Sequence, residues 1–148
     1  MKLDRFYPIF DSADWFRRMI PRGVKLAQLR TKDRPEPELR AEIAAAKEIS
    51  ERHGAVLVVN DHWRLAIDLR CDFIHLGQED LDEADIPAIR RAGLRLGLST
   101  HDRAELDRAL ALEPDYIALG PVYPTILKKM KWTEQGLDRV TDWKRAIG

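Results

Sequence analysis

Short runs of aliphatic and β-branched residues alternate along the chain with segments in which apolar residues recur at helical spacing. The runs predict strands at residues 6–10, 25–29, 55–59, 73–76, 94–98 and 116–119. The helical patterns predict helices near residues 14–20, 39–53, 63–69, 82–92, 106–110 and 135–147. Strand and helix therefore alternate six times, and this rhythm is typical of an α/β fold with a parallel sheet.

Individual residues support this assignment of helices. Gly54 and Gly93 are expected to end the helices that precede them, because glycine readily adopts the left-handed conformation found just past a helix end. In the fifth helical pattern, Leu106, Ala109 and Leu110 fall on one face and are expected to point inward.

Two parallel architectures compete for this pattern. Five or six strands satisfy an open, doubly wound sheet. A closed (β/α)₈ barrel needs eight strands and commonly about 250 residues, rarely under about 200. The chain has 148 residues, so strand counting favours the open sheet.

The composition excludes several classes of partner. Lysine plus arginine number 25 and aspartate plus glutamate number 25, so the net charge is zero and gives no electrostatic argument for binding nucleic acid or an anionic membrane surface. The longest apolar run, residues 55–59, is far shorter than the roughly 20 residues of a transmembrane helix. The first residues do not resemble a signal peptide. We therefore expect a cytoplasmic protein that binds neither nucleic acid nor membrane.

Cysteine chemistry is not expected to contribute. Cys71 is the single cysteine, so an intrachain disulfide and a cysteine-rich zinc site are both excluded. It is most simply a small buried apolar residue.

Polar residues gather directly after the predicted strands, where both parallel architectures place their ligand sites. After the second strand, Gln28, Arg30 and Lys32 are spaced by two, so their side chains point to the same side of an extended chain. Further sets follow the next strands: Asn60 and Asp61; Gln78, Glu79 and Asp80; Ser99, Thr100 and His101; and a basic loop with Lys128, Lys129 and Lys131.

Two aspartates in these sets predict a metal site. Asp61 and Asp80 follow consecutive strands, which lie about 4.8 Å apart in a parallel sheet. Mg²⁺ is usually held by one or two carboxylates and completes its shell with water and substrate phosphate. Arg30 and Lys32 favour a phosphorylated substrate. The alternative is that the aspartates only cap the helices that follow and that the two cations lie in a solvated loop.

Residues 99–102, Ser-Thr-His-Asp, do not predict a hydrolase triad, because neighbours in sequence cannot converge side by side. Asp102 and Glu105 instead predict a capping box for the next helix, which leaves Ser99 and Thr100 to donate hydrogen bonds to a ligand. The other histidines lack metal-ligand spacing. Structural roles are expected for His53, His62, His75, Trp15, Trp63, Trp132 and Trp143.

Five stretches together match one known family over about residues 24–137. They are residues 28–33, Gln-Leu-Arg-Thr-Lys-Asp; 59–66, Val-Asn-Asp-His-Trp-Arg-Leu-Ala; 75–81, His-Leu-Gly-Gln-Glu-Asp-Leu; 96–101, Leu-Gly-Leu-Ser-Thr-His; and 120–125, Gly-Pro-Val-Tyr-Pro-Thr. Each lies at a predicted strand end, and their number and order make the match specific. The chain resembles the thiamine phosphate synthase family.

The resemblance implies a TIM-type (β/α)₈ barrel in place of the open sheet. It also implies a transferase of thiamine biosynthesis that condenses hydroxymethylpyrimidine diphosphate with hydroxyethylthiazole phosphate to give thiamine phosphate and diphosphate, with Mg²⁺ required. In this reaction the diphosphate leaves first and the thiazole nitrogen attacks the pyrimidine methylene cation. No side-chain nucleophile is needed.

The resemblance also assigns roles by position. The magnesium ligands are expected to be Asp61 and Asp80. The expected substrate-binding residues are Gln28, Arg30, Lys32 and Asn60 around the diphosphate and pyrimidine, and Ser99, Thr125 and Lys128 around the reacting centre and the thiazole phosphate or leaving diphosphate. The catalytic residues among these are expected to be Arg30, Lys32, Ser99 and Lys128.

Two departures from the family's pattern modify this expectation. Leu127 precedes Lys128, where the family usually has a second threonine, so one hydroxyl donor to the phosphate is absent. The chain, expected to be a single domain over residues 1–148, has about six βα units and lacks strands seven and eight, whose loops normally bind the thiazole phosphate. The first and sixth strands then keep open edges, which favour homo-oligomerisation.

Three explanations of the short chain stay open at this point. They are a truncation that impairs the enzyme, a shortened chain that completes its site by oligomerising, and a protein that retains only ligand or partner binding. A thiazole tautomerase-like relative is a further alternative. It would not need the metal and diphosphate pocket that Asn60, Asp61 and Asp80 represent.

Overall fold

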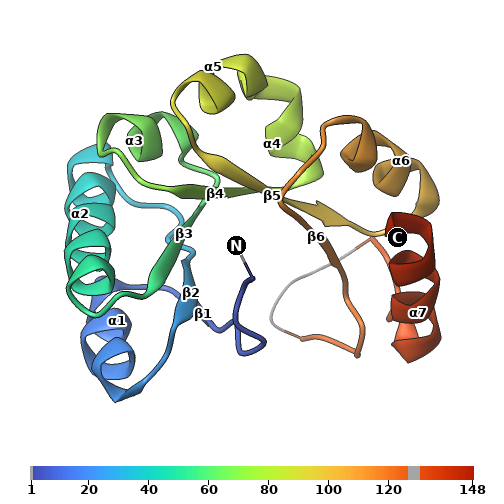
Figure 1. Cartoon of the computed structure of the whole chain (residues 1–148), viewed down its shortest axis with the longest axis horizontal. Coiled ribbons are helices and arrows are strands. Elements are labelled where there is room, and N and C mark those ends of the chain that lie inside the picture. The colour runs from blue at the N-terminus through green and yellow to red at the C-terminus, as the bar shows by residue number, and fades with distance from the viewer. Residues whose placement is uncertain (1, 127–130) are drawn as a thin grey trace. The chain divides into compact units, whose positions relative to one another are not determined.

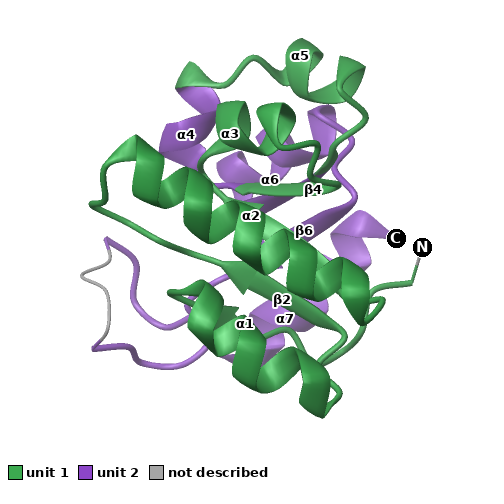
Figure 2. Cartoon of the chain, turned by 90° about the vertical axis from the view of Figure 1, so that its left-hand side faces the viewer, with its two compact units in different colours: residues 1–75, 83–95 green, residues 76–82, 96–148 purple. Residues whose placement is uncertain are grey.

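The computed structural model describes residues 2–126 and 131–148. Strands and helices alternate along the described chain (Figure 1), as the hydrophobic pattern predicts. The chain divides into two compact units, the first of residues 1–75 and 83–95 and the second of residues 76–82 and 96–148 (Figure 2). The single-domain organisation stays a prediction. Within the two described ranges, no helix is long and apolar enough to cross a membrane.

Four parallel strands form the sheet of the first unit: β1 (Ile9–Phe10), β2 (Leu26–Leu29), β3 (Val56–Asn60) and β4 (Phe73–Leu76). Each strand pairs with the next one in the chain, so that Gln28 lies opposite Ile9 on one side and Val58 on the other. On β4, Ile74 lies opposite Val59. This sequential order is how a barrel winds, whereas a doubly wound sheet reverses direction between its strands. The open, doubly wound sheet favoured by strand counting is therefore wrong.

The helices of the first unit are α1 (Ala13–Met19), the short 3₁₀ helix η1 (Ile20–Arg22), α2 (Glu36–Arg52), α3 (Trp63–Asp68) and α5 (Ile86–Arg91). Helix α1 packs against α2, and α2 packs against β3. Phe16 of α1, Ile43 of α2 and Phe73 of β4 are fully buried. Burying each such side chain contributes about 1.5–3 kcal/mol, so this core holds the ends of β2 and β3 in place.

The second unit contains two parallel strands, β5 (Arg95–Thr100) and β6 (Tyr116–Leu119), and three helices, α4 (Gln78–Glu83), α6 (Arg103–Ala111) and α7 (Gly136–Ile147). Leu106 and Ala109 of α6 are buried as predicted, and Trp143 of α7 is buried too. Leu110, also predicted to point inward, is only half-buried. Gly97 lies opposite Tyr116 in the strand pair. A Cβ atom on Gly97 would lie 2.2 Å from the Tyr116 Cζ, so a side chain at this position would displace the Tyr116 ring.

The helix predicted over residues 82–92 is confirmed only as α5 (Ile86–Arg91), since residues 82–83 instead end the separate helix α4 (Gln78–Glu83). Pro87 has no N–H group and its ring would clash with the preceding turn of a continuous helix. It is tolerated in the first turn of a new helix. The Asp85 side chain accepts a hydrogen bond from the Ala88 N–H group at 2.8 Å and caps that new start.

The first strand is also shorter than predicted, at Ile9–Phe10 in place of residues 6–10. Pro8 has no N–H group to donate to a sheet. Its carbonyl oxygen still accepts from the Gln28 N–H group at 3.0 Å, so the chain enters the sheet at Pro8.

Candidate active site

The carboxyl ends of β2 and β3 carry a group of polar side chains in the first unit. Gln28 and Asn60 are buried, and Arg30 is half-buried. Because Gln28 is in register with Val58, and side chains alternate along each strand, Gln28, Arg30 and Asn60 lie on the same face of the strand pair. The structure therefore brings these three predicted site residues together.

A lysine and an aspartate form an ion pair just beyond this group. Lys32 Nζ lies 3.7 Å from Asp61 Oδ2, and 22% of the Asp61 side chain is exposed. The Asp61 N–H group donates to the His75 carbonyl oxygen at 3.0 Å, which fixes Asp61 at the end of β3. Its φ of 63° is left-handed, a conformation that aspartate tolerates better than most residues.

Hydrogen bonds join the loops that follow β1, β2 and β3. Thr31 Oγ1 donates to the Asp11 carbonyl oxygen at 3.2 Å. His62 Nε2 lies 2.9 Å from the Thr31 carbonyl oxygen, and because a carbonyl only accepts, Nε2 is the protonated nitrogen that donates. The structural role expected for His62 is confirmed.

Sequence reasoning missed one residue of this group, Tyr7. Its hydroxyl oxygen accepts a hydrogen bond from Gln28 Nε2 at 2.9 Å. The signal that could have found it is indirect: a glutamine inside a buried strand needs a polar partner, and the hydrophobic pattern does not say which residue supplies it.

Asp80 lies in the first turn of α4 in the second unit. Its Oδ2 accepts a hydrogen bond from the Gly77 N–H group at 3.2 Å, just before the helix begins. This is the helix-capping role that the sequence left open as the alternative to metal binding. The contact occupies one carboxylate oxygen and gives Asp80 a fixed position.

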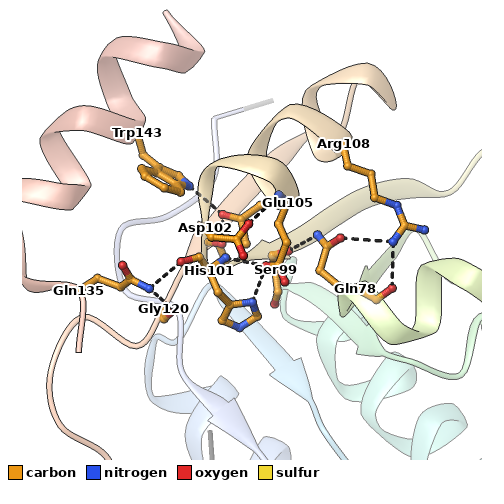
Figure 3. A network of polar contacts seen from close by, with 11 residues as sticks. Gln78, Ser99, His101, Asp102, Glu105, Arg108, Gly120, Gln135 and Trp143 are labelled. Atoms are coloured by element: carbon orange, nitrogen blue, oxygen red, sulfur yellow. Dashed lines mark hydrogen bonds and ion pairs between the residues drawn. The ribbon is translucent and has the colours of Figure 1, made fainter. Parts of the chain in front are cut away.

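Ser99 lies on β5 in the same unit and is half-buried. Its carbonyl oxygen accepts from Gln78 Nε2 at 2.7 Å (Figure 3). The start of α4, which carries Asp80, is thereby tied to the strand end that carries Ser99.

The expectation that Thr100 is available to a ligand is wrong. Thr100 is fully buried, its Oγ1 donates to the Ala118 carbonyl oxygen at 2.9 Å, and the same oxygen accepts from Trp143 Nε1 at 2.8 Å. The Thr100 hydroxyl therefore donates to β6 and accepts from α7, and both contacts are structural. The packing role expected for Trp143 is confirmed.

The capping box predicted for α6 is confirmed in a modified form. Asp102 Oδ1 accepts from the Glu105 N–H group at 2.9 Å. Glu105 reaches back to His101 rather than to Asp102, and its Oε2 accepts from the His101 N–H group at 2.7 Å.

The two remaining predicted residues follow β6. Thr125 is exposed. Lys128 and its neighbour Leu127 lie outside the described residues. A hollow of about 270 Å³ elsewhere in the second unit is lined by Gln78, Glu79, Asp82, Ala104, Glu105 and Arg108. Gln78 and Glu79 belong to a polar set noted in the sequence, but the hollow includes none of the residues predicted to bind substrate or metal, so it is not the predicted site.

The donor set suits a hard divalent cation. Within residues 2–126 and 131–148, no group of three or more His, Cys, Asp or Glu side chains could hold a metal ion. Mg²⁺ needs only one or two carboxylates with substrate phosphate and water, and Asp61 and Asp80 each present a partly exposed carboxylate. Asp61 belongs to the first unit and Asp80 to the second. Each carboxylate by itself has the chemistry of a Mg²⁺ ligand, and their meeting at one ion stays a prediction.

Comparison with known proteins identifies the class of fold. A solved structure described as thiamine phosphate pyrophosphorylase from Pyrococcus furiosus matches with a TM-score of 0.81 and 22% sequence identity, over 96% of this chain and 70% of that one. Together with the six parallel βα units, this likeness gives the chain an α/β fold of the TIM-barrel type.

Curated relatives then identify the family. The thiamine-phosphate synthase of Rhizobium etli is 65% identical over 148 residues, which are all of this chain and 72% of that protein. The thiamine-phosphate synthase of Cronobacter sakazakii is 50% identical over 142 residues, 96% of this chain and 68% of that protein. The chain covers 64% of relatives of the same name from Escherichia coli. The family model for thiamine monophosphate synthase matches residues 6–148. The chain belongs to the thiamine monophosphate synthase family.

Proposed function

We propose that this chain forms thiamine phosphate and diphosphate from hydroxymethylpyrimidine diphosphate and hydroxyethylthiazole phosphate, in a Mg²⁺-dependent transfer in which the residues at its strand ends bind both substrates. The observation that carries the proposal is the group at the ends of β2 and β3. There Gln28, Arg30 and Asn60 share one face, and Lys32 and Asp61 form an ion pair.

This group suits a reaction in which a diphosphate departs. The C–O bond of the pyrimidine methylene breaks, and its electron pair leaves with the diphosphate. Arg30 and Lys32 stabilise that departing charge electrostatically, and such preorganised contacts contribute several kcal/mol to catalysis. Gln28 and Asn60, both buried, orient the pyrimidine beside them.

The metal ligands in this proposal are Asp61 and Asp80. Bound Mg²⁺ would neutralise diphosphate charge as a Lewis acid. In the structure the Asp61 carboxylate pairs with Lys32, whose Nζ lies 3.7 Å from Asp61 Oδ2. A bound cation would compete with Lys32 for this carboxylate. Lys32 would bind the diphosphate, and the Asp61 carboxylate would then be available to hold the cation.

The second substrate is assigned to the second unit. Ser99, Thr125 and Lys128 are assigned to the reacting centre and to the thiazole phosphate or leaving diphosphate. Ser99 is supported by the Gln78 contact that holds its backbone at 2.7 Å. No nucleophilic side chain is required, because the lone pair of the thiazole nitrogen forms the new C–N bond.

The test is thiamine phosphate formation by the purified 148-residue chain with both substrates and Mg²⁺, and with a chelator in a parallel sample. We expect product that disappears on chelation and returns when Mg²⁺ is added back. Lys32→Ala is expected to reduce the rate. Lys25→Ala, at the other end of β2, removes the same charge from an exposed position and is expected to leave the rate unchanged. A folded chain that gives no product would contradict the proposal.

The alternatives predict different results in the same assay. A chain that only binds ligand would retain pyrimidine diphosphate in equilibrium dialysis and form no product. A tautomerase-like enzyme would convert a thiazole phosphate isomer without metal. The Lys32–Asp61 pair favours the synthase over the tautomerase-like enzyme, which would need neither a metal ligand nor a diphosphate-binding cation. Product formation alone distinguishes the synthase from a chain that only binds ligand.

The proposal also covers location and assembly. The partners are the two small-molecule substrates, in the cytoplasm, and neither nucleic acid nor a membrane is involved. The exposed edge residue Ile9 of β1, 58% exposed, supports pairing between copies of the chain. Sedimentation at the assay concentration tests this, because a monomeric active chain would exclude a site completed by oligomerisation.

A further inference from the structure

Trp132 stacks on His101 within the second unit. Their ring centroids are 4.0 Å apart and their planes differ by 12°. His101 directly follows β5, and Trp132 belongs to the segment between β6 and α7. The stack therefore joins that segment to the carboxyl end of β5, and stacked rings of this kind stabilise a contact beyond the area they bury.

The His101 ring is held in place from the other side. Its Nδ1 lies 2.7 Å from Glu105 Oε2 (Figure 3). Since a carboxylate only accepts hydrogen bonds, Nδ1 carries the proton and donates. Glu105 is itself fixed, because Asp102 Oδ1 accepts from its N–H group at 2.9 Å. The first turn of α6 thus sets the ring orientation against which Trp132 packs.

Hydrogen bonds attach the same segment at its base. Gln135 Nε2 donates to the His101 carbonyl oxygen at 2.7 Å (Figure 3). The N–H groups of Gln135 and Gly136 donate to the carbonyl oxygens of Pro121 and Val122 at 2.7 and 3.0 Å. The chain just after β6 and the chain just before α7 are therefore tied together beside the end of β5.

We propose that His101 and Trp132 are positioning residues: their stack holds residues 131–135 against the end of β5, which carries Ser99. Through the hydrogen bonds to Pro121 and Val122, it also holds the start of the chain after β6 that leads to Thr125. This inference rests on the proposed function, which assigns Thr125 and Ser99 to the substrates. The condensation moves no proton, since one C–O bond breaks and one C–N bond forms from a nitrogen lone pair. The His101–Glu105 pair is therefore not required as an acid or base, and its contribution is orientation.

The kinetic test compares Trp132→Ala with Trp132→Phe. Loss of the stack is expected to raise KM for the thiazole phosphate by about three- to tenfold, the range expected from one aromatic pair, while kcat at saturation is retained. The phenylalanine variant keeps an aromatic face and is expected to restore most of the affinity. Trp15→Ala is the matched control, because Trp15 stacks on Phe10 in the first unit, and its KM values are expected to equal those of the unchanged chain.

A double variant tests whether the two rings act as one unit. His101→Ala is expected to raise the same KM, and His101→Ala combined with Trp132→Ala is expected to be no worse than either alone, since both remove one contact. Additive effects, or unchanged KM values with only a lowered melting temperature, would overturn the inference.

Amide hydrogen exchange tests the inference independently of activity. The N–H groups of Gln135 and Gly136 are expected to exchange about three- to tenfold faster in Trp132→Ala than in the unchanged chain, because loss of the stack lowers the local opening free energy. They are expected to keep their rates in Trp15→Ala. Unchanged exchange in Trp132→Ala overturns the inference. If the unsubstituted chain gives no product, the proposed function is wrong. The exchange rates of Gln135 and Gly136 in Trp132→Ala then decide the positioning inference by themselves.

Discussion

Lys32 Nζ at the end of β2 lies 3.7 Å from Asp61 Oδ2 at the end of β3. Half of the lysine side chain is exposed, and ion pairs that are open to water contribute about 0–1 kcal/mol to stability. The pair is therefore weak enough to open when a diphosphate and a cation arrive, and both groups can be changed with little cost to the fold.

Asp61→Asn is expected to lower metal-dependent turnover by at least about a hundredfold, because a metal ligand's charge contributes several kcal/mol to the transition state. Asparagine tolerates the left-handed backbone at this position as aspartate does, so the fold is expected to survive. The measurement is kcat/KM as a function of Mg²⁺ concentration, with circular dichroism of the same samples.

The matched control is Asp68→Asn. Asp68 is an exposed carboxylate of α3 that pairs with Arg40 at 3.0 Å, so its loss removes one negative charge from the same unit. It is expected to leave the Mg²⁺ dependence unchanged. Unchanged Mg²⁺ dependence in Asp61→Asn would remove Asp61 from the metal site.

Two substitutions at Asp80 separate metal binding from helix capping. Asp80→Asn keeps an oxygen that can accept from the Gly77 N–H group and removes the charge, whereas Asp80→Ala removes both. If Asp80 is a metal ligand, both variants are expected to abolish metal-dependent turnover with the fold nearly intact. Activity in Asp80→Asn at normal Mg²⁺ concentrations would mean that the carboxylate serves only as a cap.

The sequence predicted the local elements well because their signals are local. The runs at residues 73–76 and 116–119 coincide with β4 and β6, and Gly54 and Gly93 have positive φ values just past α2 and α5. Polar residues after strands also led to Gln28, Arg30 and Asp61, because the carboxyl ends of parallel strands are where such folds place ligands.

The errors arose where distant partners decide a residue's role. Thr100 looked available because its neighbours in sequence are polar, yet its partners are Ala118 and Trp143, the latter 43 residues away. The spacing of apolar residues in the sequence likewise gives no sign of the His101–Trp132 stack. The architecture was also misjudged by counting strands, since the order in which strands pair, rather than their number, distinguishes a barrel from a doubly wound sheet.

Thr100→Val tests the buried hydroxyl. Valine has nearly the same shape but leaves Trp143 Nε1 without its acceptor, and an unsatisfied buried donor costs about 1–3 kcal/mol. The free energy of unfolding from urea denaturation is expected to fall by about that amount. Thr100→Ser keeps the hydroxyl and is expected to lose less, so equal losses in the two variants would show that the hydrogen bond to Trp143 adds nothing.

Cys71 gives the chain a pH dependence of known sign. Burial raises the pKa of its thiol from 9.0 to about 11, partly opposed by Lys47. Between these values the unfolded chain releases the thiol proton and the folded chain retains it, so the unfolded state binds fewer protons and stability falls as pH rises. The measurement is the free energy of unfolding from pH 8 to pH 11 for the unchanged chain and for Cys71→Ala.

The alanine variant isolates this effect because the other groups that titrate in the range are common to both chains. The difference in stability between the two is expected to be constant below about pH 9 and to shift in favour of Cys71→Ala as pH approaches 11. The rate at which thiol reagents react with native Cys71 is expected to increase over the same pH range, since the thiolate is the nucleophile. A difference that does not change with pH, or rapid reaction at pH 8, would show that the thiol is not buried in an apolar environment.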